Sequence, residues 1–205
     1  MSSKKTNNII LCGFMASGKT SIAKALSKEL GYPYIDTDVL IIKESKMSIS
    51  EIFDKYGEDY FRDLEFDTAN KLKNFNNTII STGGGMLTFD RNVEVLKETG
   101  TIIHIKREFD DIYQTLLKDK TRPLAKQKTK EELKELYNKR LDKYIFASDY
   151  TVYNKYFLQC VKDILKIHQR NNYLRCIFLF LKFTTYIKNV IISNVFKLMF
   201  CYADY

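Results

Sequence analysis

Residues 13–20 constrain the fold of this chain more than any other segment. They read Gly-Phe-Met-Ala-Ser-Gly-Lys-Thr, follow an apolar run at 9–11 and precede a helical pattern over 21–30. A strand, a glycine-containing loop and a helix in this order are typical of a phosphate-binding loop, whose backbone N–H groups and helix N-terminus hold phosphate oxygens. Lys19 adds a positive charge, and Thr20 adds a hydroxyl suited to Mg²⁺. We therefore expect the chain to handle a nucleoside triphosphate.

Short apolar runs alternate with helical patterns along the chain. This alternation favours βαβ units, and hence an α/β fold with a parallel sheet and helices on both faces. Ser50 is expected to cap a helix that starts at Glu51, and Gly31 and Gly100 are expected to end helices. The predicted strands occupy residues 9–11, 34–35, 78–80, 101–105 and 150–152.

The length and charge of the chain limit its class. Its 205 residues are enough for one α/β domain with a sizeable core. Residues 170–205 hold five basic side chains against one acid, a net of +4, so residues 1–169 carry the other +4 of the total of +8. A mildly basic body suits polyanionic nucleotides but lacks the concentrated basic stripe of a duplex-binding protein, so we expect no nucleic-acid partner.

The four cysteines predict no metal site. Cys12, Cys160, Cys176 and Cys201 have no CxxC spacing, and only two histidines are present to join them. The apolar segment near the N-terminus is short and coincides with the first predicted strand, so we find no export signal. We expect reduced thiols in a cytoplasmic protein.

Two acids follow the second predicted strand. Asp36 and Asp38 should lie at the carboxyl edge of the sheet, where open α/β folds bind their ligands. One carboxylate can assist a metal while the other accepts a hydrogen bond from an attacking hydroxyl, as phosphoryl transfer requires. A turn rich in Asp would explain the same pattern without any chemistry.

The helix that opens at residues 57–65 places Arg62 three residues before Glu65. An ion pair would explain this spacing completely. Arg62 is also suited to bidentate capture of a substrate carboxylate, with Glu65 orienting the guanidinium. The sequence leaves both interpretations open.

Three consecutive glycines, Gly83, Gly84 and Gly85, follow the third predicted strand. Without side chains they allow a substrate or a phosphate to approach the backbone closely, although a flexible turn would read the same way. The charged segment 118–130 contains Arg122-Pro123 and predicts a mobile lid, with a solvated linker as the plainer alternative. Arg140 lies in the helical stretch 131–144 that follows.

Taken in order, these segments resemble shikimate kinase, a small P-loop kinase of the nucleoside monophosphate kinase type. The resemblance covers about residues 8–168 and includes Ile-Asp-Thr-Asp, Ile-Ser-Glu-Ile-Phe, Phe-Arg-Asp-Leu-Glu, Ser-Thr-Gly-Gly-Gly, Arg-Pro-Leu and Tyr-Asn-Lys-Arg-Leu-Asp-Lys-Tyr. It implies a three-layer fold with five parallel strands in the order 2-3-1-4-5 and a lid. It also implies a monomer with ATP as co-substrate and Mg²⁺ as cofactor.

The resemblance assigns a role to each candidate residue. Lys19, Asp38 and Arg122 would be catalytic, Asp38 as the base and Arg122 as the lid cation that neutralises the transferring phosphoryl group. Thr20 and Asp36 would hold Mg²⁺. The residues implied for ATP are Ala16, Ser17, Gly18, Lys19, Thr20, Ser21 and Arg122, and those implied for shikimate are Asp38, Arg62, Gly83, Gly84, Gly85 and Arg140.

The sequence departs from the family at two places. Ala16 stands where the family often has Gly, and a second lid arginine has no clear equivalent beyond Lys118 or Lys120.

The family's chain should also end near His168, so we expect a kinase domain over residues 1–169 and an atypical tail over 170–205. The tail holds nine of the 28 aromatic residues and no membrane span, because its longest uncharged stretch is too short. An amphipathic helix, an interfacial anchor and sequence translated past the true end remain open for it.

The expected reaction is transfer of the γ-phosphoryl group of ATP to shikimate, which gives shikimate 3-phosphate in aromatic amino-acid biosynthesis. A related kinase for another hydroxy acid such as gluconate is the nearest alternative. A kinase-like protein without activity is the second alternative, although Lys19, Thr20, Asp36 and Asp38 are all present.

Overall fold

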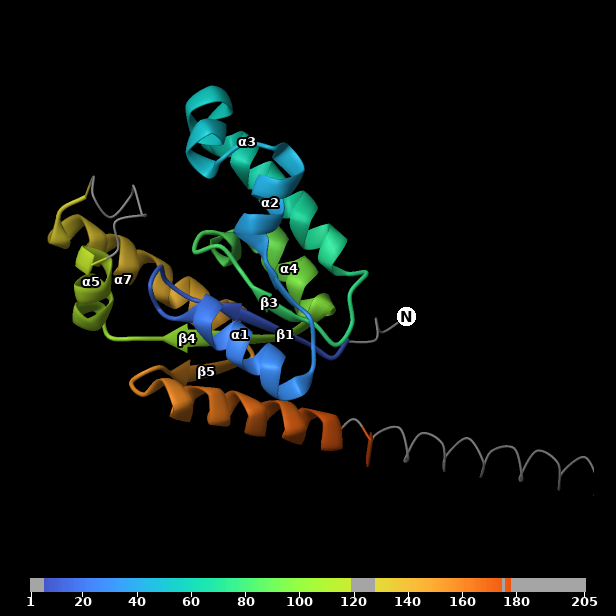
Figure 1. Ribbon diagram of the computed structural model, residues 1–205. Helices are drawn as coiled ribbons and strands as arrows, with labels where there is room; N and C mark the ends of the chain where they lie inside the picture. Colours follow the sequence, from blue (N-terminus) through green and yellow to red (C-terminus); the bar gives the residue numbers. More distant parts are fainter. Residues whose placement is uncertain (1–5, 119–127, 175, 178–205) are drawn as a thin grey trace, which may run out of the picture. The chain divides into compact units, whose positions relative to one another are not determined.

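The computed structural model describes residues 6–118, 128–174 and 176–177. Five parallel strands form one sheet in the order β2-β3-β1-β4-β5, as predicted (Figure 1). The strands are β1 (Asn8–Cys12), β2 (Tyr34–Asp36), β3 (Ile79–Ser81), β4 (Gly100–Lys106) and β5 (Tyr150–Tyr153). All five predicted strands are therefore present, with ends that differ by one residue at most.

Strand β1 lies at the centre of the sheet and is buried along its whole length. Ile10 pairs with Ile80 of β3 on one side and with Ile102 of β4 on the other. A strand buried on both faces reads as a continuous apolar run, which is why residues 9–11 showed no alternation. Burial of this strand fixes the position of the loop that follows it.

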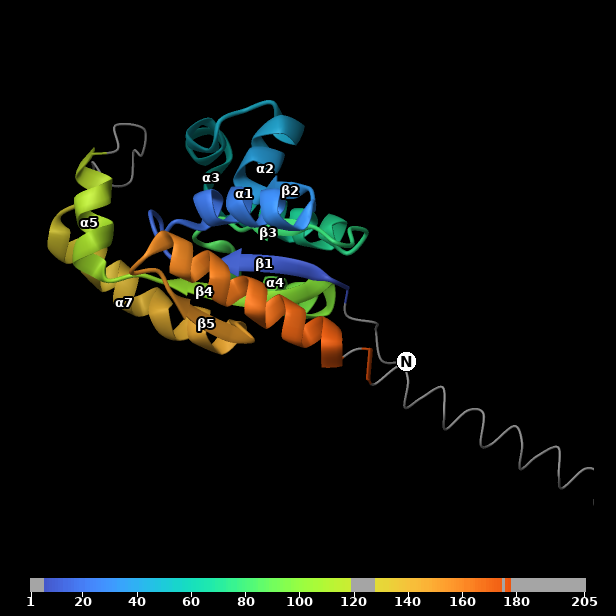
Figure 2. The ribbon, with the colours of Figure 1, turned by 60° about the horizontal axis from the view of Figure 1, so that its bottom comes forward.

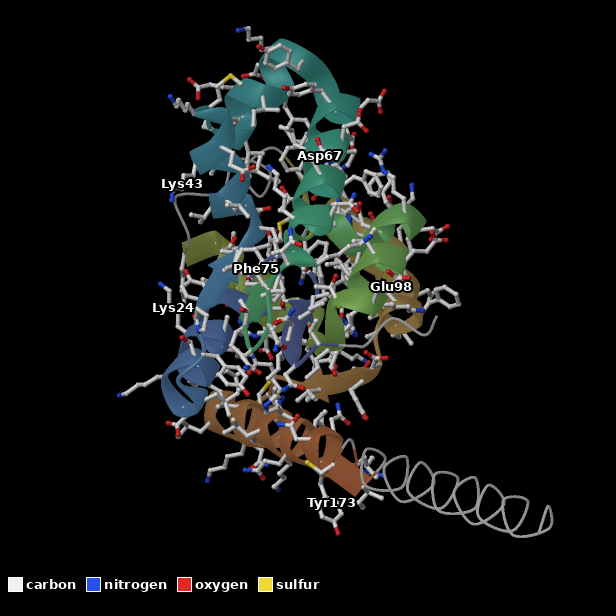
Figure 3. All side chains as sticks on the ribbon, turned by 90° about the vertical axis from the view of Figure 1, so that its right-hand side faces the viewer. Lys24, Lys43, Asp67, Phe75, Glu98 and Tyr173 are labelled. Atoms are coloured by element: carbon white, nitrogen blue, oxygen red, sulfur yellow. The ribbon has the colours of Figure 1, made fainter. Side chains whose placement is uncertain are left out.

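Helices cover both faces of the sheet. Helix α1 lies on one face, whereas α4 and α7 lie on the opposite face (Figures 1 and 2). The charged side chains of Lys24, Lys43, Asp67 and Glu98 extend outward from four of the helices and are exposed (Figure 3). The helices are α1 (Lys19–Leu30), α2 (Thr37–Ser45), α3 (Ile49–Leu72), α4 (Asp90–Thr99), α5 (Phe109–Lys118) and α7 (Lys130–Ala147), with a 3-10 turn η1 (Met86–Thr88).

The predicted cap of the third helix is wrong by two residues. Helix α3 begins at Ile49, and its N-cap is Ser48, not Ser50. Ser48 and Glu51 form a capping box, in which each side chain accepts a hydrogen bond from the other residue's backbone N–H. Ser48 has a glutamate three residues later and Ser50 does not, which decides between the two serines.

Two glycines end helices as predicted, and a third bends one. Gly31 terminates α1 in the left-handed region with φ 67°, and Gly100 terminates α4 and begins β4. Gly57 interrupts α3 with φ 82° and ψ 179°, so the helical residues before and after it run in different directions. A side chain at Gly57 would have open space around it, so the backbone conformation alone calls for glycine.

The contacts divide the chain into a first compact unit that ends at Leu165 and a second that begins at Lys166. Residues 157–174 are helical. Within the described part of the chain, no helix is both long and apolar enough to cross a membrane.

Three cysteines of the described residues, Cys12, Cys160 and Cys176, are free thiols. The predicted lid residue Arg122 and most of the tail lie outside the described residues.

Candidate functional site

Candidate site residues follow the carboxyl end of every strand of the sheet. The phosphate-binding loop follows β1, Asp38 follows β2, and the three glycines follow β3. Arg107 follows β4, and Asn154 follows β5. The carboxyl ends of parallel strands meet at one edge, which is where ligands of open α/β sheets bind.

The loop after β1 has the backbone of an anion-binding turn. Gly13 and Gly18 have φ values of 141° and 101°, which favour glycine. A Cβ at Gly13 would lie 2.7 Å from the carbonyl oxygen of Ile105, so the loop packs tightly against β4. Ala16 also has a positive φ, 57°, although it carries a side chain. Ala16 therefore holds a conformation that strains a residue with a Cβ.

Lys19 binds the backbone of the loop that precedes it. Its Nζ donates hydrogen bonds to the carbonyl oxygens of Gly13 at 2.8 Å and Phe14 at 2.9 Å. The side chain is 9% exposed, so its charge is held close to the loop. The buried hydroxyl of Ser17 has no hydrogen-bond partner among the described residues. An unsatisfied buried donor beside a buried cation is suited to phosphate oxygens.

Two side chains that support this loop were not singled out in the sequence. Asn154 Nδ2 donates to the carbonyl oxygen of Ser17 at 2.8 Å and packs against Gly18. Arg107 Nη1 donates to the carbonyl oxygen of Ala16 at 3.0 Å. Each stands directly after a strand, and that position was the one signal available for finding them.

The two predicted metal-binding residues lie together. Thr20 Oγ1 donates to Asp36 Oδ2 at 3.1 Å, while Asp36 Oδ1 accepts from the backbone N–H of Asp38 and caps α2. A hydroxyl and a carboxylate beside a phosphate-binding loop form an oxygen donor set, which suits Mg²⁺. Ser21 is the third residue of α1 and is exposed.

Each glycine of the triple-glycine segment faces a different candidate side chain. A Cβ on Gly83 would collide with Asp38 Oδ1, and one on Gly85 would lie 2.6 Å from Arg62 Nη1. A Cβ on Gly84 would lie 3.7 Å from both Arg140 Nη1 and the backbone nitrogen of Met15. The segment thus joins the three predicted substrate-binding side chains to one another and to the phosphate-binding loop.

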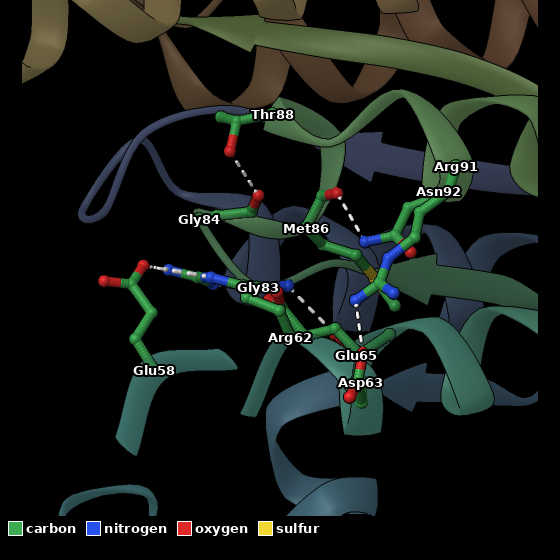
Figure 4. A network of polar contacts seen from close by, with 12 residues as sticks. Glu58, Arg62, Asp63, Glu65, Gly83, Gly84, Met86, Thr88, Arg91 and Asn92 are labelled. Carbon is green, nitrogen blue, oxygen red and sulfur yellow. Dashed lines mark hydrogen bonds and ion pairs between the residues drawn. The ribbon is translucent and has the colours of Figure 1, made fainter. Parts of the chain in front are cut away.

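Arg62 is held between two carboxylates of its own helix (Figure 4). Its Nη1 contacts Glu65 at 2.7 Å, and its Nη2 contacts Glu58 at 2.6 Å. The guanidinium also lies over the rings of Phe61 and Phe89, at 5.4 and 5.0 Å from their centroids. The ion pair with Glu65 that the sequence allowed is therefore present, and so is the approach to the glycines.

The charged groups of this cluster shift one another's pKa values. Burial raises the pKa of Glu65, and Arg62 and Arg140 oppose that rise while Asp38 adds to it. Burial would lower the pKa of Arg62, but the carboxylates of Glu65 and Glu58 outweigh it and raise that pKa. Arg62 therefore stays charged beside the buried Glu65, an arrangement suited to binding an organic anion.

Helix α7 adds two side chains to this cluster. Arg140 Nη1 donates to the carbonyl oxygen of Gly84 at 3.2 Å, and the Tyr144 hydroxyl donates to the same oxygen. Tyr144 is 1% exposed, and burial raises its pKa. Its ring packs on that of His104, whose pKa is lowered to about 4, mainly by burial and then by Lys106 and Lys19. The sequence analysis included Tyr144 at the end of a family motif but gave it no role, although its position four residues after Arg140 places both on one helix face.

Comparison with known proteins agrees with this geometry. The sequence model of the family "Shikimate kinase" matches residues 15–169. A shikimate kinase of Clostridium botulinum (strain 657, type Ba4) is 42% identical over 139 residues, which are 67% of this chain and 82% of that protein. A structure of shikimate kinase from Acinetobacter baumannii in complex with shikimate has a TM-score of 0.75 and 29% identity, and the match covers 82% of this chain and 96% of that one.

A gluconokinase from Sinorhizobium meliloti shares the fold at 13% identity, with a TM-score of 0.52 and coverage of 84% of this chain and 99% of that one. That likeness shows the fold alone, so the gluconate alternative is not favoured. The family match spans more than half of the chain, and the Clostridium relative is covered over most of its length. The chain therefore belongs to the shikimate kinase family, enzymes that transfer a phosphoryl group from ATP to shikimate.

Proposed function

We propose that this chain phosphorylates shikimate to shikimate 3-phosphate at the edge of the sheet where the triple-glycine segment meets the phosphate-binding loop. The observation that supports this site is the contact of Gly83, Gly84 and Gly85 with Asp38, Arg140 and Arg62 in turn. The same segment borders Met15 in the loop that would hold ATP. An acceptor hydroxyl beside Asp38 would then lie close to the terminal phosphate.

The substrate's carboxylate would bind between the two arginines. Arg62 and Arg140 come from different helices and both border the glycine segment. Arginine is suited to this role because its planar guanidinium offers paired N–H donors. Asp38 would hold the ring hydroxyls and accept the proton released when the hydroxyl attacks.

The phosphate side would use Lys19 and the loop backbone. Lys19 now contacts two loop carbonyls, and we expect its Nζ to turn to the β- and γ-phosphates when ATP binds. Thr20 and Asp36 would hold Mg²⁺, which when bound neutralises charge on the phosphates. Arg122 lies outside the described residues, and its role as the lid cation stays a prediction. A monomeric state and a cytoplasmic location are also part of this proposal.

The test is ADP release by the purified chain with Mg²⁺-ATP and either shikimate or gluconate. We expect turnover with shikimate and none with gluconate, and the product should be shikimate 3-phosphate. Arg62→Ala should raise KM for shikimate far more than KM for ATP, while Lys19→Ala should abolish turnover in a folded protein. Turnover with gluconate alone, or a fully active Lys19→Ala variant, would contradict the proposal.

Asp36→Asn tests the metal site separately. The amide is a weaker ligand than the carboxylate, so the Mg²⁺ concentration that gives half-maximal rate should rise. Asp54→Asn, which changes an exposed acid on α3, serves as the control and should leave the Mg²⁺ requirement as it is. An unchanged requirement in Asp36→Asn would remove Asp36 from the metal site.

A further inference from the structure

The two carboxylates on Arg62 differ sharply in exposure. The side chain of Glu65 is 2% exposed, whereas that of Glu58 is 62% exposed. Glu65 is therefore a permanent partner of Arg62. If Arg62 moved away, the buried carboxylate of Glu65 would lose this ion pair. Glu58 can release Arg62 into water at little cost, because exposed ion pairs contribute little to stability.

Glu58 occupies the edge of the guanidinium best suited to a ligand. Its Oε1 accepts from Arg62 Nε at 3.1 Å and from Nη2 at 2.6 Å, whereas Glu65 accepts from Nη1 alone (Figure 4). Nε and Nη2 are the parallel donors that bind a carboxylate in a bidentate manner. The exposed glutamate thus makes the contact that a substrate carboxylate would seek.

The kink in α3 puts Glu58 at this position. Glu58 directly follows Gly57, whose non-helical backbone starts a new helical segment. A carboxylate at the start of a helical segment is favoured by the helix dipole, and the spacing of four residues brings it onto Arg62. Local structure within α3 therefore favours this position of Glu58.

We propose that Glu58 is a competing carboxylate that the substrate's carboxylate displaces from Arg62, so that Glu58 sets the affinity for shikimate. This inference rests on the proposed function. Asp38, Glu58 and Glu65 already place three acids around Arg62 and Arg140, and a further carboxylate on the same edge of Arg62 would meet Glu58 at close range. Since like charges there repel and Glu58 is the exposed member, Glu58 is the one that leaves.

The test compares Glu58→Gln with a matched variant, Asp63→Asn. Asp63 is an exposed acid on the same helix, and its carboxylate pairs with Arg91 at 2.8 Å. Glu58→Gln keeps the size of the side chain and removes its charge. An exposed ion pair shifts an equilibrium by about two- to fivefold, so KM for shikimate should fall by about that factor while KM for ATP stays the same. Asp63→Asn should change neither KM.

A binding measurement separates this proposal from the proposed function. Calorimetric titration with shikimate in the absence of ATP should give a lower Kd for Glu58→Gln than for the unchanged chain. The neutral amide of shikimate, which has no carboxylate, should bind both proteins equally. An equal or higher Kd for shikimate in Glu58→Gln overturns the role of Glu58, even where turnover with shikimate upholds the proposed function. No binding of shikimate to either protein overturns both.

Discussion

The hydroxyl of Tyr144 donates a hydrogen bond to the carbonyl oxygen of Gly84, which also accepts one from Arg140. One backbone oxygen therefore joins helix α7 to the glycine segment that borders Asp38 and Arg62. Tyr144 thereby holds the segment on which three candidate substrate contacts depend.

Tyr144→Phe should weaken both the fold and shikimate binding. Loss of this hydrogen bond costs about 1 kcal/mol of unfolding free energy, and the loosened segment should raise KM for shikimate several-fold without changing KM for ATP. Tyr137→Phe is the matched control, because Tyr137 lies on the same helix and donates to the carbonyl oxygen of Arg107 at 3.0 Å. It should lose similar stability in urea unfolding and keep its KM for shikimate. Equal KM values in both variants would limit Tyr144 to a structural role.

Alanine substitutions along the three glycines should have graded effects. A methyl group at Gly83 or Gly85 would displace Asp38 or Arg62, whereas one at Gly84 makes ordinary contacts. Loss of a hydrogen bond to a charged group weakens binding by about 10- to 100-fold. Gly83→Ala and Gly85→Ala should therefore raise KM for shikimate by about that factor. Gly84→Ala should change KM much less. Steady-state kinetics on the three variants provides the measurement, and equal effects at all three positions would contradict the geometry.

Ala16→Gly should stabilise the chain. Ala16 has φ 57°, a left-handed conformation that strains any residue with a Cβ. After the greater freedom of glycine in the unfolded chain is subtracted, the gain should be about 0.5 kcal/mol in unfolding free energy. Ala23→Gly, in the interior of α1, is the control and should destabilise the chain. A loss of stability in both variants would show that the loop backbone differs from the one described.

His104→Phe should flatten the pH dependence of stability. The pKa of His104 is about 4 in the folded chain against 6.5 in the unfolded one. As pH falls from 6.5 to 4, the unfolded chain takes up a proton that the folded chain does not, so the unfolding free energy falls by about 3 kcal/mol. Below pH 4 both states are protonated and no further loss follows.

The measurement is urea unfolding of the unchanged chain and of His104→Phe across this pH window. Phenylalanine keeps a ring against Tyr144 and has no titrating group. The difference in unfolding free energy between the two proteins should therefore change steadily between pH 6.5 and pH 4. Parallel curves would show that His104 titrates alike in both states.

The sequence predicted the sheet well because its signals are local. Strand β1 is buried on both faces, so its apolar run could be recognised without knowledge of its neighbours. The cap of α3 was misplaced because Ser48 and Ser50 are chemically identical, and the partner at Glu51 distinguishes them. The strain at Ala16 was also missed, since a φ value is not visible in a residue name.

The sequence by itself determined the phosphate-binding loop, the alternating elements and the residues that resemble a shikimate kinase, because each is encoded in a short contiguous segment. Only the tertiary structure decided that Asp38, Arg140 and Arg62 border one glycine each, and that Tyr144 and Asn154 support the loops. Asp38, the glycine segment and Asn154 meet because parallel strands bring their carboxyl ends to one edge, whereas Arg62, Arg140 and Tyr144 come from helices α3 and α7, which pack beside the glycine segment. The spacing between Arg62, Glu58 and Glu65 was visible in the sequence, but their burial was not. Glu58 and Glu65 are seven residues apart and lie on the same face of α3, so their burial differs along the helix and not around it, and this difference separates the permanent partner of Arg62 from the exposed one.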